Sequence, residues 1–287
     1  MDGGETSYMG RKKKKDKKRK QSKSTEASRA DRHDLYQRSV QEPSADAPFM
    51  HRVFKNHFGR PPRSLREDFS GTSALACHWV ERHIENTACA IDLDPNPLEW
   101  GRKHNVSKLT DDQAARIKLI EGNVLDVGNG SFDITVAFNF SYMTFSQRPL
   151  MLRYFKQARA TLGEEGIFMI DIYGGPDAQQ TLSETRECDG FDYVWDQHRF
   201  DPIHCGAVNY IHFEFSDGSR MRRAFRYDWR LWSLPELKDV MAEAGFSKSE
   251  VYWEGTDKKT GEGNDVYKSR ESAEDDPAWV CYVAGIR

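Results

Sequence analysis

The segment Ala88-Cys89-Ala90-Ile91-Asp92-Leu93-Asp94-Pro95-Asn96-Pro97 decides the fold of this chain. It begins with four consecutive apolar residues, continues with an acid, and ends with prolines of the kind that open helices. This order predicts a strand buried on both faces that leads directly into a helix. Asp92, at the end of the strand, is expected at the sheet edge where open α/β proteins bind ligands.

Short apolar strands and helical segments alternate on both sides of this segment. Strands are predicted at residues 65–69, 88–93, 117–121, 132–138 and 167–172, and helices at 73–83, 97–105 and 150–162. Such alternation is typical of parallel strands joined by right-handed crossovers. After residue 175 we predict strands at 191–195, 207–215 and 220–229, a helix at 235–244, and strands at 250–253 and 279–284.

We therefore predict an α/β fold with a doubly wound, Rossmann-like sheet of seven mostly parallel strands. An antiparallel β insertion, or lid, at 176–232 follows the fifth strand, and two N-terminal helices within 31–60 precede the first. Residues 31–287 would form one domain. The polar stretch 255–277 is longer than ordinary loops, and both a lid and disorder are open for it.

The composition is that of a polar globular chain. Hydrophobic residues make up 38% and charged residues 30% of the 287 residues, which allows one good core. No apolar run approaches the roughly 20 residues that span a bilayer, and no apolar segment follows the N-terminal charges. We therefore expect no membrane partner and a cytoplasmic location. The five cysteines form no C-x-x-C pair, which predicts reduced thiols and no metal site.

The N-terminal region differs from the rest of the chain in charge. Residues 1–30 carry 11 Lys and Arg against 4 Asp and Glu, a net charge of +7, whereas the whole chain carries −3, which leaves −10 for residues 31–287. The basic run at 11–20 has nothing to bury and repels itself, so we predict a disordered tail at 1–30. A nuclear address, an RNA or membrane tether and a plain solvated tail are all open for it. The acidic body argues against a nucleic-acid partner.

The first strand carries three consecutive charges where a strand buried on both faces is normally apolar. We expect Glu67 and Asp68 to face a cationic ligand, with Gly71 allowing the backbone to approach it closely. The alternative is an ion pair within the protein, made by Arg66.

The acids that end the second strand divide between two roles. Asp92 lies 21 residues after Gly71, where a carboxylate can accept hydrogen bonds from the hydroxyls of a ribose. Asp94 is expected to cap the helix that follows. A capping role for both acids is the alternative.

These motifs resemble, in order, those of the class I S-adenosylmethionine-dependent methyltransferases, from about residue 34 to the C-terminus. That family's first motif is an acid followed two residues later by a glycine-rich turn. Here Glu67 stands at the acid, and Phe69 and Ser73 replace two of the three usual glycines. The other matches are Asp92-Leu93, Gly122-Asn123-Val124, Asn139-Phe140-Ser141-Tyr142 and Leu162-Gly163-Glu164-Glu165-Gly166.

The resemblance implies S-adenosylmethionine as the cofactor and a small polar metabolite as the methyl acceptor. The implied cofactor-binding residues are Tyr36, Glu67, Asp68, Phe69, Gly71, Asp92, Leu93, Asn123, Val124 and Asn139. Our catalytic candidates are Tyr142 and Asp171, with core packing as the alternative for Tyr142. The substrate candidates are Tyr173, Trp195, Arg226 and Trp229, because aromatic faces can hold a cationic substrate. The alternative for the aromatic insertion is packing on the core or on a second subunit, as in a homodimer.

Other functions stay open at this point. A nicotinamide oxidoreductase would need G-x-G-x-x-G after the first strand, where only Gly71 is present. The missing glycines also suit a non-catalytic binding module. A methyltransferase acting on a protein or nucleic acid would use the basic tail to reach its target. Asn139 and Tyr142 match the ends of the Asn-Pro-Pro-Tyr motif of amino-group methyltransferases, without its prolines.

Overall fold

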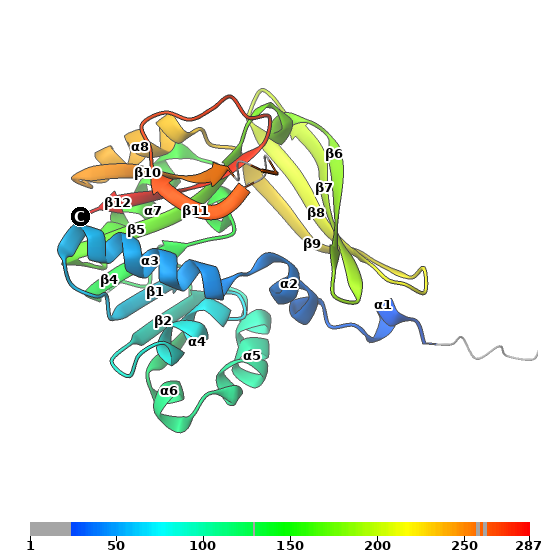
Figure 1. Cartoon of the computed structure of the whole chain (residues 1–287), viewed down its shortest axis with the longest axis horizontal. Coiled ribbons are helices and arrows are strands. Elements are labelled where there is room, and N and C mark those ends of the chain that lie inside the picture. The colour runs from blue at the N-terminus through cyan, green and yellow to red at the C-terminus, as the bar shows by residue number, and fades with distance from the viewer. Residues whose placement is uncertain (1–23, 129, 257–258, 261–262) are drawn as a thin grey trace, which may run out of the picture.

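The computed structural model describes residues 24–128, 130–256, 259–260 and 263–287, which form two sheets flanked by helices (Figure 1). The central sheet has the strand order β11-β10-β12-β5-β4-β1-β2-β3. Its strands are β1 (Ser64–Asp68), β2 (Thr87–Asp92), β3 (Ile117–Glu121), β4 (Phe132–Ala137), β5 (Leu162–Gly174), β10 (Lys248–Thr256), β11 (Gly263–Ser269) and β12 (Trp279–Ile286).

Parallel pairing dominates this sheet. β1 pairs in parallel with β2 and β4, β2 with β3, and β4 with β5, whereas β12 is antiparallel to β5 and β10. The strand order reverses beside β1, which places loops from both halves around the carboxyl ends of β1 and β4. The predicted doubly wound, mostly parallel α/β fold is confirmed.

The eighth strand, β11, lies within the stretch 255–277, for which we expected a lid or disorder. It pairs antiparallel with β10 at the edge of the sheet. The ring of Tyr267 lies 4.8 Å from that of Tyr282 and 5.6 Å from that of Phe49. The strand has only Val266 and Tyr267 as large apolar residues, so its sequence carries too little alternation to predict it.

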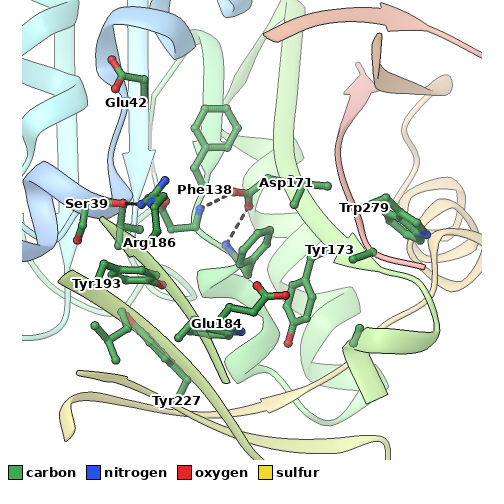
Figure 2. A pocket seen from close by; sticks show the side chains of 18 of the residues that line it. Ser39, Glu42, Phe138, Asp171, Tyr173, Glu184, Arg186, Tyr193, Tyr227 and Trp279 are labelled. Carbon is green, nitrogen blue, oxygen red and sulfur yellow. Dashed lines mark hydrogen bonds between the residues drawn. The ribbon is translucent and has the colours of Figure 1, made fainter. Parts of the chain in front are cut away.

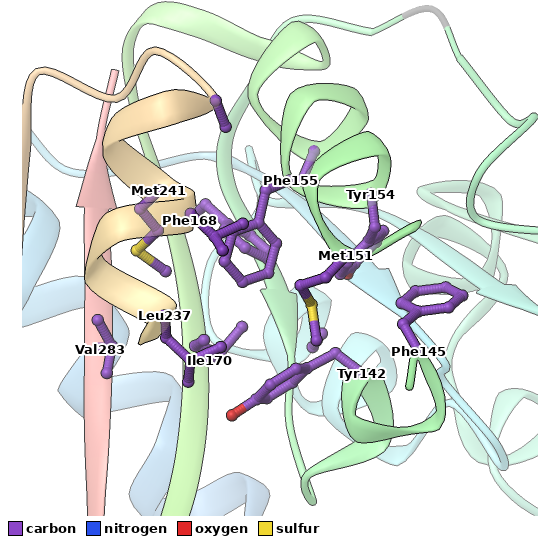
Figure 3. Packing of buried hydrophobic residues seen from close by; sticks show 14 of the residues in the cluster. Tyr142, Phe145, Met151, Tyr154, Phe155, Phe168, Ile170, Leu237, Met241 and Val283 are labelled. Atoms are coloured by element: carbon purple, nitrogen blue, oxygen red, sulfur yellow. The ribbon is translucent and has the colours of Figure 1, made fainter. Parts of the chain in front are cut away.

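Helices cover both faces of the central sheet. α3 (Pro43–Phe58) and α4 (Ala74–Glu81) contribute to the core on one face, with Ile167 and Met169 of β5. α7 (Arg148–Ala160) and α8 (Leu234–Glu243) contribute to the core on the other, with Phe168 and Ile170. Figure 3 shows this second core, where Phe168 lies between the two helices. Alternate residues of β5 therefore feed opposite cores, as a doubly covered strand requires.

Capping residues set where two helices begin. α5 (Pro95–His104) begins after Asp94, whose carboxylate accepts the N–H of Asn96 at 2.9 Å, so the predicted cap is confirmed. α8 begins after Ser233, which forms a capping box with Glu236. The short helices α6 (Asp111–Ala115) and η1 (Val106–Lys108) connect α5 to β3.

The insertion after β5 forms a second, antiparallel sheet. Its strands pair in the order β6-β7-β8-β9: β6 (Leu182–Cys188), β7 (Phe191–Asp201), β8 (Gly206–Glu214) and β9 (Arg220–Arg230). The last three match predicted strands, whereas β6 was not predicted because most of its residues are polar and exposed. η3 (Pro176–Gln179) connects β5 to this sheet, which stands beside the central sheet in Figure 1.

The N-terminal helices join the two sheets. α2 (Arg32–Val40) packs Leu35 against Phe191, Ile211 and Phe213 of the antiparallel sheet, while α3 packs on the central sheet. α1 (Glu26–Arg29) lies at the β8–β9 turn, where the N–H of Glu26 donates to Asp217 at 2.9 Å. Residues 24–30 are therefore ordered, contrary to the tail predicted for 1–30, and residues 1–23 lie outside the described residues. No helix in the described part of the chain is long and apolar enough to cross a membrane.

Candidate functional site

Two of the three charged side chains of β1 form an ion pair with each other inside the protein. Arg66 and Asp68 form an ion pair with Nε–Oδ1 at 2.7 Å, and their side chains are 1% and 0% exposed. Tyr154 donates its hydroxyl to the other oxygen of Asp68 at 3.0 Å. The internal ion pair that we weighed as the alternative is therefore present. Asp68 also borders a small hollow beside Glu67 and Phe69, so its predicted contact with the cofactor stays a prediction.

Glu67 is buried beneath the turn that follows β1. It accepts the backbone N–H of Ala76, in the first turn of α4, at 3.0 Å. Burial raises the pKa of Glu67 to about 8, so it is largely protonated at neutral pH. It borders a small hollow together with Asp68, Phe69 and Asn139, three other residues predicted to bind the cofactor.

The turn after β1 keeps a glycine-like backbone although two glycines are replaced. Phe69, Gly71 and Ser73 have φ angles of 57°, 54° and 57°, in the left-handed region. The space beside Gly71 is open, since a Cβ built there meets nothing within 4 Å. The turn is fastened by Asp92, whose Oδ2 accepts the N–H of Gly71 at 2.7 Å.

Asp92 and Leu93 form a surface that fits a nucleoside. Asp92 accepts the N–H of Asp94 at 2.9 Å through Oδ1, so each of its oxygens has one backbone partner and keeps acceptor capacity for a hydroxyl. Leu93, next along the chain, is 68% exposed and offers an apolar face. A carboxylate with acceptor capacity, an exposed apolar side chain and the open space at Gly71 therefore belong to one surface.

The end of β3 fits the prediction less well. The side-chain oxygen of Asn123 accepts the N–H of Leu125 at 3.0 Å and so holds a local turn. The side chain of Val124 is buried in the core beside α7, so any contact with a ligand would have to come from its backbone, and its predicted role stays a prediction. Sequence spacing does not say which way the side chains of this motif point.

Asp171 near the end of β5 fastens the loop after β4. Its two oxygens accept the N–H groups of Asn139 and Phe140 at 2.7 and 2.9 Å, and both residues have left-handed φ angles of 57° and 58° (Figure 2). Asp171 is 7% exposed, and burial raises its pKa to about 7. It therefore combines a role in loop geometry with a carboxyl group that titrates near neutral pH.

Tyr142 belongs to the core and not to the site. Its side chain is fully buried among residues of α7 and β5, as Figure 3 shows for Met151 and Ile170. Its hydroxyl donates to the backbone carbonyl of Asp171 at 2.8 Å. The predicted catalytic role of Tyr142 is therefore wrong, and the core-packing alternative is correct.

A cavity of about 1040 Å³ lies between the edge of the central sheet and the antiparallel sheet. It brings together seven of the described residues predicted for the site or cited with it. They come from α2, the loop after β4, β5, β7 and β9: Tyr36, Asn139, Phe140, Asp171, Tyr173, Trp195 and Trp229. Figure 2 shows Asp171 and Tyr173 on one side of this space and Tyr193 and Tyr227 on another. Arg226 lies outside the cavity in an exposed ion pair with Asp228 at 2.7 Å, so its predicted substrate contact is wrong.

Several residues of the cavity were missed from the sequence. Glu184 lies on β6, a strand that the sequence does not predict. Asp46 lies on α3, one of the N-terminal helices, for which no role in the site was predicted. Trp279 opens β12 opposite Gly174, the last residue of β5. This position could have been found, because the start of an antiparallel strand lies at the same sheet edge as the ends of its parallel neighbours.

α2 closes the region between the glycine turn and the cavity. The side-chain oxygen of Gln37 accepts from the hydroxyl of Thr72 at 3.0 Å and from the amide of Asn105 at 2.8 Å. Tyr36, the preceding residue, lines the cavity, and its ring lies 4.8 Å from that of Phe225 on β9. One helix therefore contacts the predicted cofactor turn, the cavity and the insertion.

Comparison with known proteins identifies the fold. No family model and no curated protein sequence matches the chain. A solved S-adenosylmethionine-dependent methyltransferase from Clostridium acetobutylicum aligns with a TM-score of 0.63 at 15% identity, over 88% of this chain and 96% of that one. The sugar N-methyltransferase KedS8 from a Streptoalloteichus species aligns at 0.60 and 18% identity, over 100% and 98%. The amino pentose methyltransferase CalS10 from Micromonospora echinaspora, solved with S-adenosylmethionine, aligns at 0.61 and 13%, over 88% and 94%. The chain thus has the fold of S-adenosylmethionine-dependent methyltransferases over nearly its whole length.

Proposed function

We propose that this protein transfers a methyl group from S-adenosylmethionine to a small polar metabolite. The observation that carries the proposal is where the large cavity lies. The cavity shares Asp46, Phe138 and Asn139 with the small hollow that Glu67 and Phe69 border at the glycine turn. Its volume, about 1040 Å³, is at the upper end of the range for small-molecule sites, roughly 300–1,000 Å³. Two of the similar structures are a sugar N-methyltransferase and an amino pentose methyltransferase, which supports an acceptor of this size.

The residues around the glycine turn would hold the cofactor. Asp92 would accept the ribose hydroxyls, Leu93 would pack on the adenine, and the open backbone at Gly71 would face the amino-acid end. When bound, the cofactor supplies a methyl group attached to a positively charged sulfur.

The chain itself would supply alignment, a dry cavity and a proton acceptor. The aromatic walls would limit the access of water to a bound acceptor, and the hydrogen bonds of Asp171 hold the loop at Asn139 and Phe140 in one geometry. Asp171 is the proposed proton acceptor, because its pKa of about 7 lies close to the working pH, where general-base catalysis is most effective. We therefore keep Asp171 as the catalytic candidate.

Two measurements test the proposal. Isothermal titration with S-adenosylhomocysteine should show binding, whereas NAD(H) should not bind. Incubation with labelled S-adenosylmethionine and metabolite fractions should then transfer label to a small molecule, with total protein and RNA as controls. Deletion of residues 1–23 should leave that transfer unchanged. Absence of cofactor binding, or label found only in protein or RNA, would overturn the proposal.

A further inference from the structure

The charges on the cavity wall have one predominant sign. Among the described residues that line it, six are acidic: Glu42, Asp46, Asp171, Asp177, Glu184 and Glu254. Arg186 is the single Lys or Arg among the same described residues. Its guanidinium donates to the backbone carbonyl of Ser39 and lies 5.3 Å from the ring of Tyr193, so it is already engaged within the protein. The potential inside the cavity is therefore negative, which repels anionic metabolites and attracts cationic ones.

The aromatic rings of the cavity form a continuous wall rather than scattered contacts. The ring of Trp229 lies 4.4 Å from that of Tyr227, 6.0 Å from that of Trp195 and 6.3 Å from that of Tyr173. These rings come from β5, β7 and β9, so both sheets contribute to the wall. The faces of Trp and Tyr rings attract cations, Trp most strongly. An uncharged apolar ligand would also pack on them but would gain nothing from the acids.

Two of the carboxylates stand on different walls of the same space. Asp171 is fixed to the floor by its two backbone partners, and Glu184 projects from β6 on the antiparallel sheet. Figure 2 shows Tyr173 and Glu184 projecting into the cavity, with the carboxylate of Asp171 turned toward the backbone N–H groups of the loop after β4. Asp46, on α3, accepts the hydroxyl of Tyr282 at 3.0 Å. A positive group inside the cavity would thus meet carboxylates and aromatic faces together.

From this combination we infer that the methyl acceptor is an amine, which enters the cavity as an ammonium cation. The inference rests on the proposed methyltransferase function and narrows its substrate class. The ammonium would first lose one proton, which the Asp171 carboxylate takes. The lone pair of the nitrogen then forms the bond to the methyl carbon, and the electron pair of the broken carbon–sulfur bond stays on sulfur. The proton leaves Asp171 to water afterwards.

Burial raises the pKa of Asp46 and of Asp171 to about 7. A nearby positive charge favours the ionised form of a carboxyl group and lowers its pKa. An ammonium ligand should therefore bind with release of protons near pH 7, whereas an alcohol of the same skeleton should not.

The experiment compares matched ligands that differ only in the charged group. The probes are cyclohexylamine, cyclohexanol and cyclohexanecarboxylate, and glucosamine, glucose and glucuronate, each titrated to high millimolar concentration. Quenching of tryptophan fluorescence reports binding, since Trp195, Trp229 and Trp279 line the cavity. The protein is the full chain saturated with S-adenosylhomocysteine. We expect the amine to bind most tightly in each set and the carboxylate most weakly, with the amine weakened by added salt.

A matched pair of variants tests whether the preference for the amine arises inside the cavity. Glu184→Gln removes one charge from the wall, and Glu187→Gln removes one from the same strand at a residue that does not line the cavity. Glu184→Gln should weaken amine binding about two- to fivefold, the range for one partly exposed charge pair, and leave the alcohol unchanged. Glu187→Gln should leave both unchanged.

The outcomes separate this inference from the proposed function. Equal binding of amine and alcohol, tighter binding of the carboxylate, no amine binding at all, or equal effects of the two variants would each overturn the inference. Binding of S-adenosylhomocysteine, measured by calorimetry on the same samples, decides the proposed function independently. A protein that binds S-adenosylhomocysteine without preferring the amine is a methyltransferase candidate for another acceptor.

Discussion

Replacement of Asp92 by alanine should reduce the affinity for S-adenosylhomocysteine by about 10- to 150-fold. In the proposed site the Asp92 carboxylate accepts hydrogen bonds from the ribose hydroxyls. Each hydrogen bond to a charged group contributes about 1.5–3 kcal/mol. At about 1.4 kcal/mol per factor of ten, the loss of one such bond already gives this range. The change also removes the acceptor for the N–H of Gly71, which lies 2.7 Å from Oδ2, so the free energy of unfolding should fall as well. Affinity is measured by calorimetry at 25 °C, on protein that thermal unfolding shows to be folded.

Asp94→Ala is the matched control, because Asp94 stands two residues further along the same loop. Its carboxylate caps α5 through Asn96, so its removal should cost about 1 kcal/mol of stability. It should leave the affinity for S-adenosylhomocysteine within about twofold, because a cap to one backbone N–H is a local interaction. The reasoning is refuted if Asp92→Ala binds as tightly as the unaltered protein, or if Asp94→Ala loses as much affinity.

Three further predictions concern the buried polar groups. Asp68→Ala leaves the charge of Arg66 buried and unpaired, so urea unfolding should show a loss of about 3–5 kcal/mol; a loss below about 1 kcal/mol would contradict the ion pair. Because the pKa values of Asp46 and Asp171 are raised to about 7, the folded chain holds protons there that the unfolded chain releases near pH 4. Their contribution to stability is thus complete below pH 4 and is lost as pH rises through 7, and urea unfolding at a series of pH values should show a shallower fall for Asp46→Asn. Tyr142→Phe should cost about 0.5–1.5 kcal/mol of stability and leave methyl transfer within about twofold, whereas a tenfold loss of transfer at unchanged stability would return Tyr142 to the catalytic site.

The parts of the fold that follow from local sequence were predictable. The apolar run before Asp92 gives a buried strand, and the prolines after it give a helix start, whatever the rest of the chain does. The caps at Asp94 and Ser233 are likewise local, because each side chain bonds to an N–H two or three residues away. These features depend only on the spacing of residues along the chain, so they can be predicted from the sequence.

The features that failed depend on direction in space. Tyr142 was identified from its motif, but its side chain turns into the core, where its hydroxyl donates to the Asp171 carbonyl. The pairing of Asp68 with Arg66 likewise depends on where the two side chains point, and the strand sequence left an ion pair and a ligand contact open. β6 was missed because its side chains are mostly polar, so no apolar alternation marks it. Glu184 was missed with it. The direction of these side chains and the pairing of β6 depend on contacts with segments that are distant in the sequence. A local sequence pattern does not contain that information.

The carboxylates of Asp92 and Asp171, which lie at or near the ends of their strands, make the same kind of contact. Asp92 at the end of β2 accepts the N–H of Gly71 in the loop after β1, and Asp171 near the end of β5 accepts those of Asn139 and Phe140 in the loop after β4. Each acid thus holds a loop of the neighbouring strand.

The loops held in this way carry unusual backbone conformations. Phe69 and Ser73 in the first loop, and Asn139 and Phe140 in the second, all have φ between 57° and 58°. A left-handed conformation costs a residue other than glycine roughly 1–2 kcal/mol. Such a cost persists only where surrounding contacts fix the backbone, and here the carboxylate bonds do so. Phe69 and Ser73 therefore adopt backbone angles that glycine adopts more readily. The geometry that glycine normally allows is maintained here by acids on the adjacent strands, next to the proposed cofactor and acceptor sites.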